Sequence, residues 1–369
     1  MKAFVAGVLD WYGRYERPVS SASLVAGFLF EWFALKRIDL FWENVWVGAH
    51  FFIIALFIIL VNFHENKEND AGRQSHKDAS KLHFWYLTVL QGFFGGTLST
   101  FLVFYFRSAE ILVSWPFLLL LLAATAASEA FKKHYERLLF QLSLFYLSLL
   151  AFAIYIVPVV FRRIGSDVFL ISGFVSLVVL FFFILCIRFF AREKFKESKK
   201  VLAASVFGIF FVTNILYFLN LIPPIPLSLK DGGVYHSLIK EAGGDYIAEY
   251  EDAGVAGYFS FYENIHIIQG EPVYAYGAIF SPAEFNTNIV HEWQRYDEDS
   301  GKWVTETRIN LSASGGREAG YRTYSMKNSV APGKWRVNVE TLGGQVIGRL
   351  RFNAVLTEER PALKMEIKD

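Results

Sequence analysis

The chain has 369 residues, of which 54% are hydrophobic, 18% aromatic and only 19% charged. This composition is too apolar for an ordinary soluble protein and is typical of a membrane protein that carries a soluble part. Residues 1–222 contain 21 Lys and Arg against 15 Asp and Glu, whereas residues 223–369 contain 15 against 20. An acidic C-terminal part argues against nucleic acid as a partner. The single cysteine, Cys186, excludes a disulfide framework and a cysteine-based metal site.

Seven apolar segments are long enough to cross about 30 Å of hydrocarbon. They lie near residues 20–38, 45–63, 84–106, 111–128, 139–161, 168–190 and 201–222. We expect the fourth to continue as a helix through "SEAFKKHYERL". Before the first, apolar and aromatic residues recur at helical spacing, which predicts a short helix in the membrane interface. The sequence therefore predicts a helical transmembrane domain over residues 1–222, with the lipid bilayer as its surroundings.

The orientation of this domain follows from the positive charges in its connections. The N-terminus and the regions 64–83, 129–138 and 188–200 together hold 16 Lys and Arg, whereas the regions 36–44, 107–110 and 162–167 hold 5. Cytoplasmic loops carry the excess of positive charge, so we expect a cytoplasmic N-terminus. With seven spans the chain after residue 222 then lies in the periplasm of a bacterium, and the protein is a multi-pass inner-membrane protein. This prediction depends on residues 20–38 crossing the membrane, although Glu31 interrupts them.

Glu31 and His50 are the ionisable residues that lie deep inside the predicted spans, where such groups are costly. They lie at equal distances from the centre of the first outer loop, so an antiparallel hairpin places them at the same depth. We expect their side chains to face each other, either as a structural pair or as a proton-linked site. In the third span, Gly92 and Gly96 have the spacing that favours close helix packing.

The pattern of the chain changes after the last span. Prolines at 223, 224 and 226 predict a stiff linker, and "VYHSLIKEA" predicts a short helix, so that residues 223–244 connect the two domains. Alternating residues then predict strands at 272–280, 288–296, 302–311, 333–341 and 345–356. Roughly seven or eight such strands over residues 245–369 suggest an antiparallel β-sandwich, immunoglobulin-like in architecture.

Several stretches resemble a known family. The segments "GEPVYAYGAIFSP", "HEWQRYDEDSGKWV", "YRTYSMKN" and "PGKWRVNVETLGGQVIGRLRF" are similar to the C-terminal module called domain of unknown function 2914. The membrane part, with its "IPPIPLSLKDGGVYHS" exit, resembles the multi-span region that precedes this module in many uncharacterised proteobacterial proteins. The resemblance implies the same architecture and brings no activity, ligand or catalytic residues.

Three kinds of residue in the β domain are candidates for ligand binding. His291 and Glu292 begin like a zinc-protease helix, but no second histidine follows and the segment reads as a strand. Trp293, Trp303 and Trp335 could stack on a sugar ring or fill the core of the sandwich. The arginines could bind an anionic ligand or form cross-strand pairs with glutamates. These arginines are Arg308, Arg317, Arg322, Arg336, Arg349 and Arg351.

The sequence shows no nucleophile elbow, phosphate-binding glycine loop or dinucleotide fingerprint. We therefore expect a non-enzymatic protein without a cofactor or a metal, whose periplasmic sandwich binds an envelope protein or a glycan. A second hypothesis is a transporter or channel that uses Glu31 and His50. A third is a membrane-embedded envelope enzyme with His50 as its general base.

Overall fold

The computed structural model describes residues 28–29, 31–33, 40–71, 76–242, 245–252, 254, 260–281, 287–313 and 321–368. The chain divides into two compact units. The helical unit comprises residues 1–107, 115–157 and 167–219. The β unit comprises residues 220–369 together with two short segments, 108–114 and 158–166.

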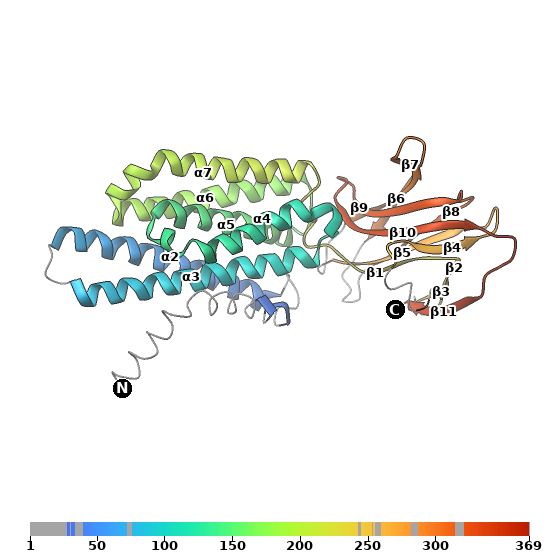
Figure 1. Ribbon diagram of the computed structural model, residues 1–369, viewed down its shortest axis with the longest axis horizontal. Helices are drawn as coiled ribbons and strands as arrows, with labels where there is room; N and C mark the ends of the chain where they lie inside the picture. Colours follow the sequence, from blue (N-terminus) through green and yellow to red (C-terminus); the bar gives the residue numbers. More distant parts are fainter. Residues whose placement is uncertain are drawn as a thin grey trace, which may run out of the picture. The chain divides into compact units, whose positions relative to one another are not determined.

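The helical unit is built from long helices that run alongside one another (Figure 1). Their bounds are α2 Phe41–Ala71, α3 His76–Arg107, α4 Ile111–Ala130, α5 Leu138–Phe161, α6 Ser166–Phe190 and α7 Arg192–Phe218. Within the described part of the chain, these six helices are long and apolar enough to span a membrane. They confirm the six spans predicted after residue 38. The predicted interfacial helix and most of the span 20–38 lie outside the described residues. The part of this span that is described, residues 28–29 and 31–33, is helical.

The fourth helix does not continue as the sequence suggested. α4 ends at Ala130 and is followed by a short 3₁₀ helix, Lys132–Glu136. Within this turn Tyr135 is buried, with its ring against Phe94 and Phe140 at centroid distances of 5.9 and 5.1 Å. The tighter 3₁₀ turn thus contributes an aromatic side chain to the core of the helical unit.

Buried polar side chains connect the helices. Asn62 on α2 donates to Gln141 Oε1 on α5 at 2.7 Å, and both side chains are fully buried. The Tyr105 hydroxyl on α3 donates to the carbonyl of Ala151 on α5 at 2.9 Å. Because hydrocarbon offers no water as an alternative partner, such polar groups must be satisfied within the protein. These bonds therefore fix which faces of α2, α3 and α5 meet.

The β unit contains eleven strands within the described residues, in three sheets (Figure 1). The middle sheet has the order β1-β5-β8, the five-stranded sheet β4-β10-β9-β6-β7, and the third sheet β11-β3-β2. The bounds are β1 Ser228–Tyr235, β2 Ser237–Lys240, β3 Tyr246–Glu251, β4 Glu263–Ile267, β5 Val273–Phe280, β6 Thr287–Asp297, β7 Lys302–Ala313, β8 Tyr321–Lys327, β9 Gly333–Thr341, β10 Val346–Leu356 and β11 Leu363–Lys368. Neighbouring strands are antiparallel except β10 and β4, which are parallel.

The middle and five-stranded sheets pack face to face and confirm the predicted sandwich. Their shared core contains Trp293, Trp335 and Phe352 from the five-stranded sheet, together with Val273 and Ala275 from β5. All five are almost completely buried. Side chains alternate along a strand, so every second residue of β9 and β10 enters this core, as the sequence predicted.

The third sheet adds a layer that the sequence did not predict. It covers the other face of the middle sheet, where Tyr276 and Ala278 of β5 pack with Tyr246 and Ala248 of β3. Strand β5 is therefore enclosed on both sides. This explains why its residues are buried almost without interruption, whereas a strand with one wet face alternates.

The connection between the units also differs from the prediction. The expected helix over 234–242 is wrong, because this segment contains the end of β1 and all of β2. The proline segment is packed into the β unit rather than extended away from it. Leu227 is fully buried in a cluster with Ile279 and Val339, and the carbonyl of Ile222 accepts a hydrogen bond from Gln345.

Candidate functional site

His291 and Trp293 lie inside the sandwich, on the face of β6 that meets β8. Both are 0% exposed. His291 Nδ1 is 2.9 Å from Ser325 Oγ, its Nε2 is 3.2 Å from Thr323 Oγ1, and Trp293 Nε1 donates to Ser325 Oγ at 2.9 Å. Burial lowers the pKa of His291 to about 4, because desolvation penalises the imidazolium. His291 is therefore a neutral core residue, out of reach of a ligand in solvent.

The arginines that the sequence grouped together lie in different places. Arg308 on β7 donates to Glu340 on β9 at 2.6 Å, across the outer face of the five-stranded sheet. Arg322 is on β8 in the middle sheet and donates to Asp245 at 2.9 Å. Arg317 lies outside the described residues. Arg308 and Arg322 therefore make local ion pairs and do not share a site.

Arg336, Arg349 and Arg351 do come together, on the outer face of the five-stranded sheet. In the register of β9 and β10, Arg351 is opposite Arg336 and Arg349 is opposite Asn338. Like charges in opposed positions destabilise an antiparallel pair. Burial and the charge of Arg349 lower the pKa of Arg336 to about 10. Burial and the charge of Arg351 lower the pKa of Arg349. We call these three residues the arginine cluster.

Two members of the arginine cluster are held by neutral groups. Arg336 Nε donates to Gln294 Oε1 at 2.6 Å, and its guanidinium lies 4.3 Å over the ring of Trp303. Arg349 Nε donates to Asn338 Oδ1 at 2.6 Å. In both side chains the hydrogen bond to the amide uses Nε. The two terminal nitrogens, the pair that binds carboxylate or phosphate in a forked geometry, make no hydrogen bond to any described residue.

The third member, Arg351, forms a direct ion pair with a described residue. Its Nη2 donates to Glu110 Oε1 at 2.6 Å, and both side chains are largely buried. Its guanidinium also lies 4.8 Å over the ring of Phe261. Among the described residues, one carboxylate is thus bonded directly to the cluster, and the charge of Glu292 acts on Arg336 and Arg349 without a direct bond.

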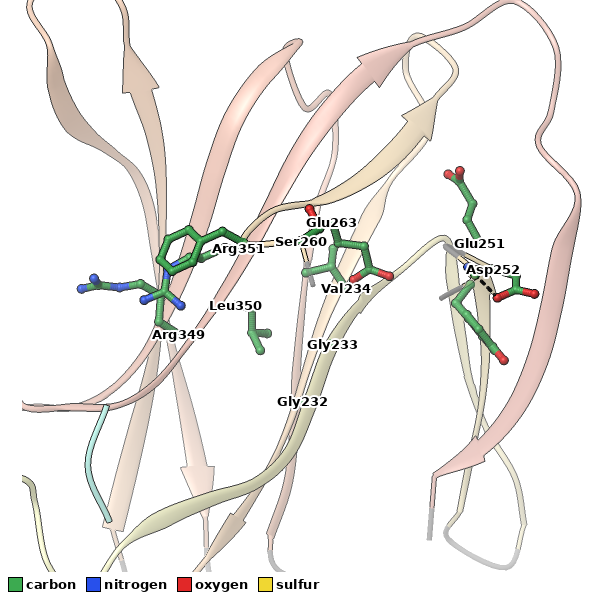
Figure 2. Close-up of a pocket in the computed structure, with 13 residues that line it drawn as sticks. Gly232, Gly233, Val234, Glu251, Asp252, Ser260, Glu263, Arg349, Leu350 and Arg351 are labelled. Carbon is green, nitrogen blue, oxygen red and sulfur yellow. Dashed lines mark hydrogen bonds between the residues drawn. The ribbon is translucent and has the colours of Figure 1, made fainter. Parts of the chain in front are cut away.

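A cavity of about 420 Å³ adjoins Arg349 and Arg351, between β1 of the middle sheet and β10. Figure 2 shows these two side chains at one end and Glu251 and Asp252 at the other, with Leu350, Val234 and Glu263 between them. Cavities of this size hold small molecules or the end groups of larger ones. The lining comes from β1, the end of β3, the start of β4 and β10.

Glu251 at the far end of the cavity is fixed by two histidines. Its Oε1 is 2.7 Å from His236 Nε2, and its Oε2 is 2.5 Å from His266 Nδ1. Burial would raise the pKa of Glu251, but the hydrogen bonds from His266 and His236 outweigh it and hold the pKa below its usual value. This arrangement ties β3 of the third sheet to β4 of the five-stranded sheet. Among the described residues, no group of three or more His, Cys, Asp or Glu side chains could hold a metal ion.

Sequence analysis found only part of this cavity. The alternation in "VIGRLRF" placed Arg349 and Arg351 on one face, and the structure brings them together with Arg336. It did not find Glu251, Glu263 or Phe261, because β3 and β4 were not predicted as strands. The missed signal was the alternation in "YIAEYE" and "ENIHI".

In the helical unit, Glu31 and His50 lie beside the same glycine. A methyl group built on Gly96 would be 3.6 Å from His50 Nε2 and 3.8 Å from Glu31 Oε1. His50 Nδ1 is 2.9 Å from the carbonyl oxygen of Trp46. That carbonyl can only accept, so Nδ1 carries a proton and Nε2 of the neutral ring is free to accept one on the side of Gly96.

Gly92 and Gly96 differ in their surroundings. Gly96 gives room to the side chains of Glu31 and His50, whereas a methyl group on Gly92 would contact no described residue. Gly92 is exposed on α3. The predicted close packing of helices through both glycines is therefore not found at Gly92, and at Gly96 the neighbours are polar side chains.

Comparisons with known proteins match only parts of this picture. No curated protein matches the chain. One solved structure, described as an immunoglobulin-like protein from Pseudomonas aeruginosa, is 12% identical, with 35% of this chain and 91% of that chain covered and a TM-score of 0.19. Another, the alkylpurine DNA glycosylase AlkC from Pseudomonas fluorescens bound to DNA containing an abasic-site analog, is 11% identical, with 83% and 97% covered and a TM-score of 0.21. Neither likeness is close enough to support an argument.

The family model described as protein of unknown function (DUF2914) matches residues 286–354. This range runs from the start of β6 to near the end of β10 and contains all three members of the arginine cluster. The chain thus has several apolar helices and a C-terminal β unit, part of which matches the model of this family.

Proposed function

We propose that this chain is a non-catalytic binding protein, anchored in the inner membrane of a bacterium by its helices. The N-terminus lies in the cytoplasm and the β unit in the periplasm. There the β unit binds an envelope protein or glycan through an anionic group of that partner. The distribution of Lys and Arg, 16 on one set of connections against 5 on the other, supports this orientation.

The observation that carries the proposal is the meeting of three arginine side chains on one face of the five-stranded sheet. Arg351 faces Arg336 across two paired strands, and Glu110 is the cluster's directly bonded carboxylate among the described residues. Like charges in opposed positions repel each other, and a bound anion would reduce this repulsion. The terminal nitrogens of Arg349, which make no hydrogen bond to a described residue, and the cavity that Arg349 lines provide the place for that anion.

The proposal is tested by measuring anion binding to the full-length protein in detergent. Isothermal titration at constant ionic strength compares inorganic phosphate, sulfate and acetate, with chloride as the background ion. We expect saturable binding of at least one of the three. The Arg349→Gln variant should weaken it tenfold or more, because a bidentate contact is lost.

Arg295→Gln is the matched control, because Arg295 lies on the same sheet and pairs with Glu306 at 3.4 Å outside the cluster. This variant should bind the anion as the wild type does. The absence of saturable binding, or an equal loss in both variants, would refute the proposal.

The proposed orientation has its own test. Alkaline phosphatase is active only in the periplasm, so a fusion after Asp369 should be active and a fusion at Lys196 inactive. The opposite result would place the β unit in the cytoplasm.

A second candidate function is proton-linked transport in the helical unit. It is favoured by one observation, that Glu31 Oε1 and His50 Nε2 both lie within 4 Å of the same point at Gly96. In liposomes with an imposed pH gradient, proton movement that either Glu31→Gln or His50→Gln abolishes would support it. If Glu31 and His50 have only a structural role, no such proton movement should occur, and the double variant should retain its fold.

A further inference from the structure

The outer face of the five-stranded sheet carries aromatic rings among its positive charges. Tyr296 and Trp303 lie opposite each other on β6 and β7, with ring centroids 5.3 Å apart. Phe261 and Tyr262 come just before β4, the strand at the other edge of this sheet. All four side chains reach the surface, and Phe261 is 60% exposed. We call these four residues the aromatic group.

Each ring of the aromatic group lies next to a cation. Lys334 of β9 is 5.9 Å from the ring centroids of both Tyr262 and Tyr296. Arg336 and Arg351 of the arginine cluster lie over the other two rings. Such contacts are favourable because the face of an aromatic ring attracts positive charge. Lys334 is exposed and forms no ion pair with any described residue, so its charge remains available to a ligand.

The rings and cations form a band across the sheet. Strands β7, β6, β9 and β10 are neighbours in this order, and three strand spacings make the band about 14 Å wide. Amide side chains lie in it as well, because Gln294 accepts from Arg336 and Asn353 donates to Asn264. The surface of a sheet suits an extended chain that crosses several strands.

These three kinds of side chain together match one class of polymer. An aromatic ring stacks on the C–H face of a sugar, and an amide can donate to one hydroxyl and accept from its neighbour. Arginine and lysine bind carboxylates. An acidic peptide would use the cations and leave the rings without a stacking partner. A glycan that carries carboxylates uses all three.

We infer that this band binds an acidic polysaccharide, whose sugar rings stack on the aromatic group and whose carboxylates bind the arginine cluster and Lys334. This inference rests on the proposed function and specifies its ligand class. Of the three tryptophans that the sequence offered for sugar stacking, it assigns this role to Trp303. Trp293 and Trp335 are buried in the core of the sandwich.

The test measures the binding of four probes to the full-length protein by isothermal titration. It uses constant ionic strength and a detergent without a sugar headgroup. The probes are a hexamer of galacturonic acid, the methyl ester of this hexamer, hexaglutamate and hexathymidylate. The methyl ester keeps the sugar rings and removes the charges, whereas hexaglutamate keeps the charges and lacks the rings. We expect the galacturonate hexamer to bind at least tenfold more tightly than each of the other three.

Variants separate the contribution of the rings from that of the charges. Phe261→Leu and Tyr296→Leu should each lower the ratio of galacturonate to hexaglutamate affinity several-fold, because a stacking ring is replaced by an apolar side chain. The control is Tyr324→Leu, at a 42% exposed tyrosine on β8 of the middle sheet, and it should keep the wild-type ratio. Lys334→Gln should weaken binding of the hexamer and leave that of its methyl ester unchanged.

The outcomes distinguish this inference from the proposed function. If hexaglutamate or hexathymidylate binds as tightly as the galacturonate hexamer, and phosphate binding still depends on Arg349, the inference is overturned and anion binding stands. Equal affinities for the hexamer and its methyl ester would also overturn the inference, because the cations would then contribute nothing. The absence of binding by the hexamer and by phosphate, sulfate and acetate would overturn both.

Discussion

Arg351 and Arg336 occupy directly opposed positions on β10 and β9, with their side chains on the same outer face. Two positive charges in such positions repel each other, and the pair is retained here beside a third arginine, Arg349. The nearby carboxylate of Glu110 bonds to Arg351 at 2.6 Å. The local balance of charge therefore depends on Glu110, on Glu292, whose charge acts on Arg336 and Arg349, and on any anion that binds there.

Replacing Glu110 by Gln should lower stability and strengthen anion binding. The β unit should lose about 1–3 kcal/mol, because the largely buried Arg351 loses its charged partner. Phosphate affinity should rise several-fold, because one competing negative charge is gone. Hydrogen exchange in peptides of β9 and β10 measures the first effect, and isothermal titration measures the second. Glu298→Gln, in an exposed turn, is the control, and an unchanged phosphate affinity in Glu110→Gln would contradict the prediction.

The buried histidine predicts a loss of stability in acid. The unfolded chain binds a proton at His291 near pH 6.5, whereas the folded chain does so only near its lowered pKa of about 4. The unfolded state therefore binds more protons in this window, and stability falls as pH decreases from about 6.5 to 4. The full effect is on the order of 3 kcal/mol.

His291→Gln should remove this part of the pH dependence while preserving a polar contact to Ser325. Glu340 acts in the opposite direction, because burial and the charge of Glu292 raise its pKa to about 7, so the wild-type profile contains both effects. The measurement is therefore the difference in hydrogen exchange between wild type and variant at each pH. A constant difference from pH 7 to pH 4.5 would show that His291 does not titrate as expected.

A pair of glycines on α3 tests the geometry around Glu31 and His50. Gly96→Leu should destabilise the helical unit by about 1–3 kcal/mol, because the larger side chain displaces both polar groups. Gly92→Leu should have little effect, since no described residue lies within 4 Å of a methyl group at this position. Thermal unfolding in detergent, read by size-exclusion chromatography, compares the two. Equal losses would mean that Gly96 has no special neighbours.

Another glycine pair tests the packing of the sandwich. A methyl group at Gly348 would approach Leu229 Cβ to 2.8 Å, whereas one at Gly343 would meet only Thr341 Oγ1 at 3.7 Å. Gly348→Ala should therefore destabilise the β unit by about 1–3 kcal/mol, and Gly343→Ala should not. Adding Leu229→Ala to Gly348→Ala should recover part of the loss, as expected for directly coupled positions. Additive losses in hydrogen exchange would rule out the clash.

The parts of the fold that the sequence predicted are those with a clear local pattern. Long apolar runs identified α2 to α7, and strict alternation at Trp335 and Val337 identified β9 and its buried face. The prediction of a helix over 234–242 was wrong. Val234 and Leu238 have the spacing of one face of a helix, but they lie in β1 and β2. In the structure Val234 packs between the middle and five-stranded sheets, whereas Leu238 packs with the third sheet.

The third sheet and the cavity could not be predicted in the same way. The tyrosines of β5 alternate as they would in a strand with one face in water, and nothing local shows that another sheet covers them. The cavity joins Glu263 on β4 to Arg349 on β10, strands whose parallel pairing depends on the whole topology. Sequence patterns indicate which face a residue occupies, and they do not indicate which distant strand lies beside it.

The pairing of β11 with β3 has a consequence for the order in which the β unit assembles. Strands β4 to β10 all lie between these two partners in the chain. During synthesis β3 therefore emerges from the ribosome long before β11 can reach it. Until then the tyrosine face of the middle sheet lacks part of its cover. Closing the third sheet is a late, long-range step, of the kind that slows folding and leaves a nascent chain exposed to aggregation.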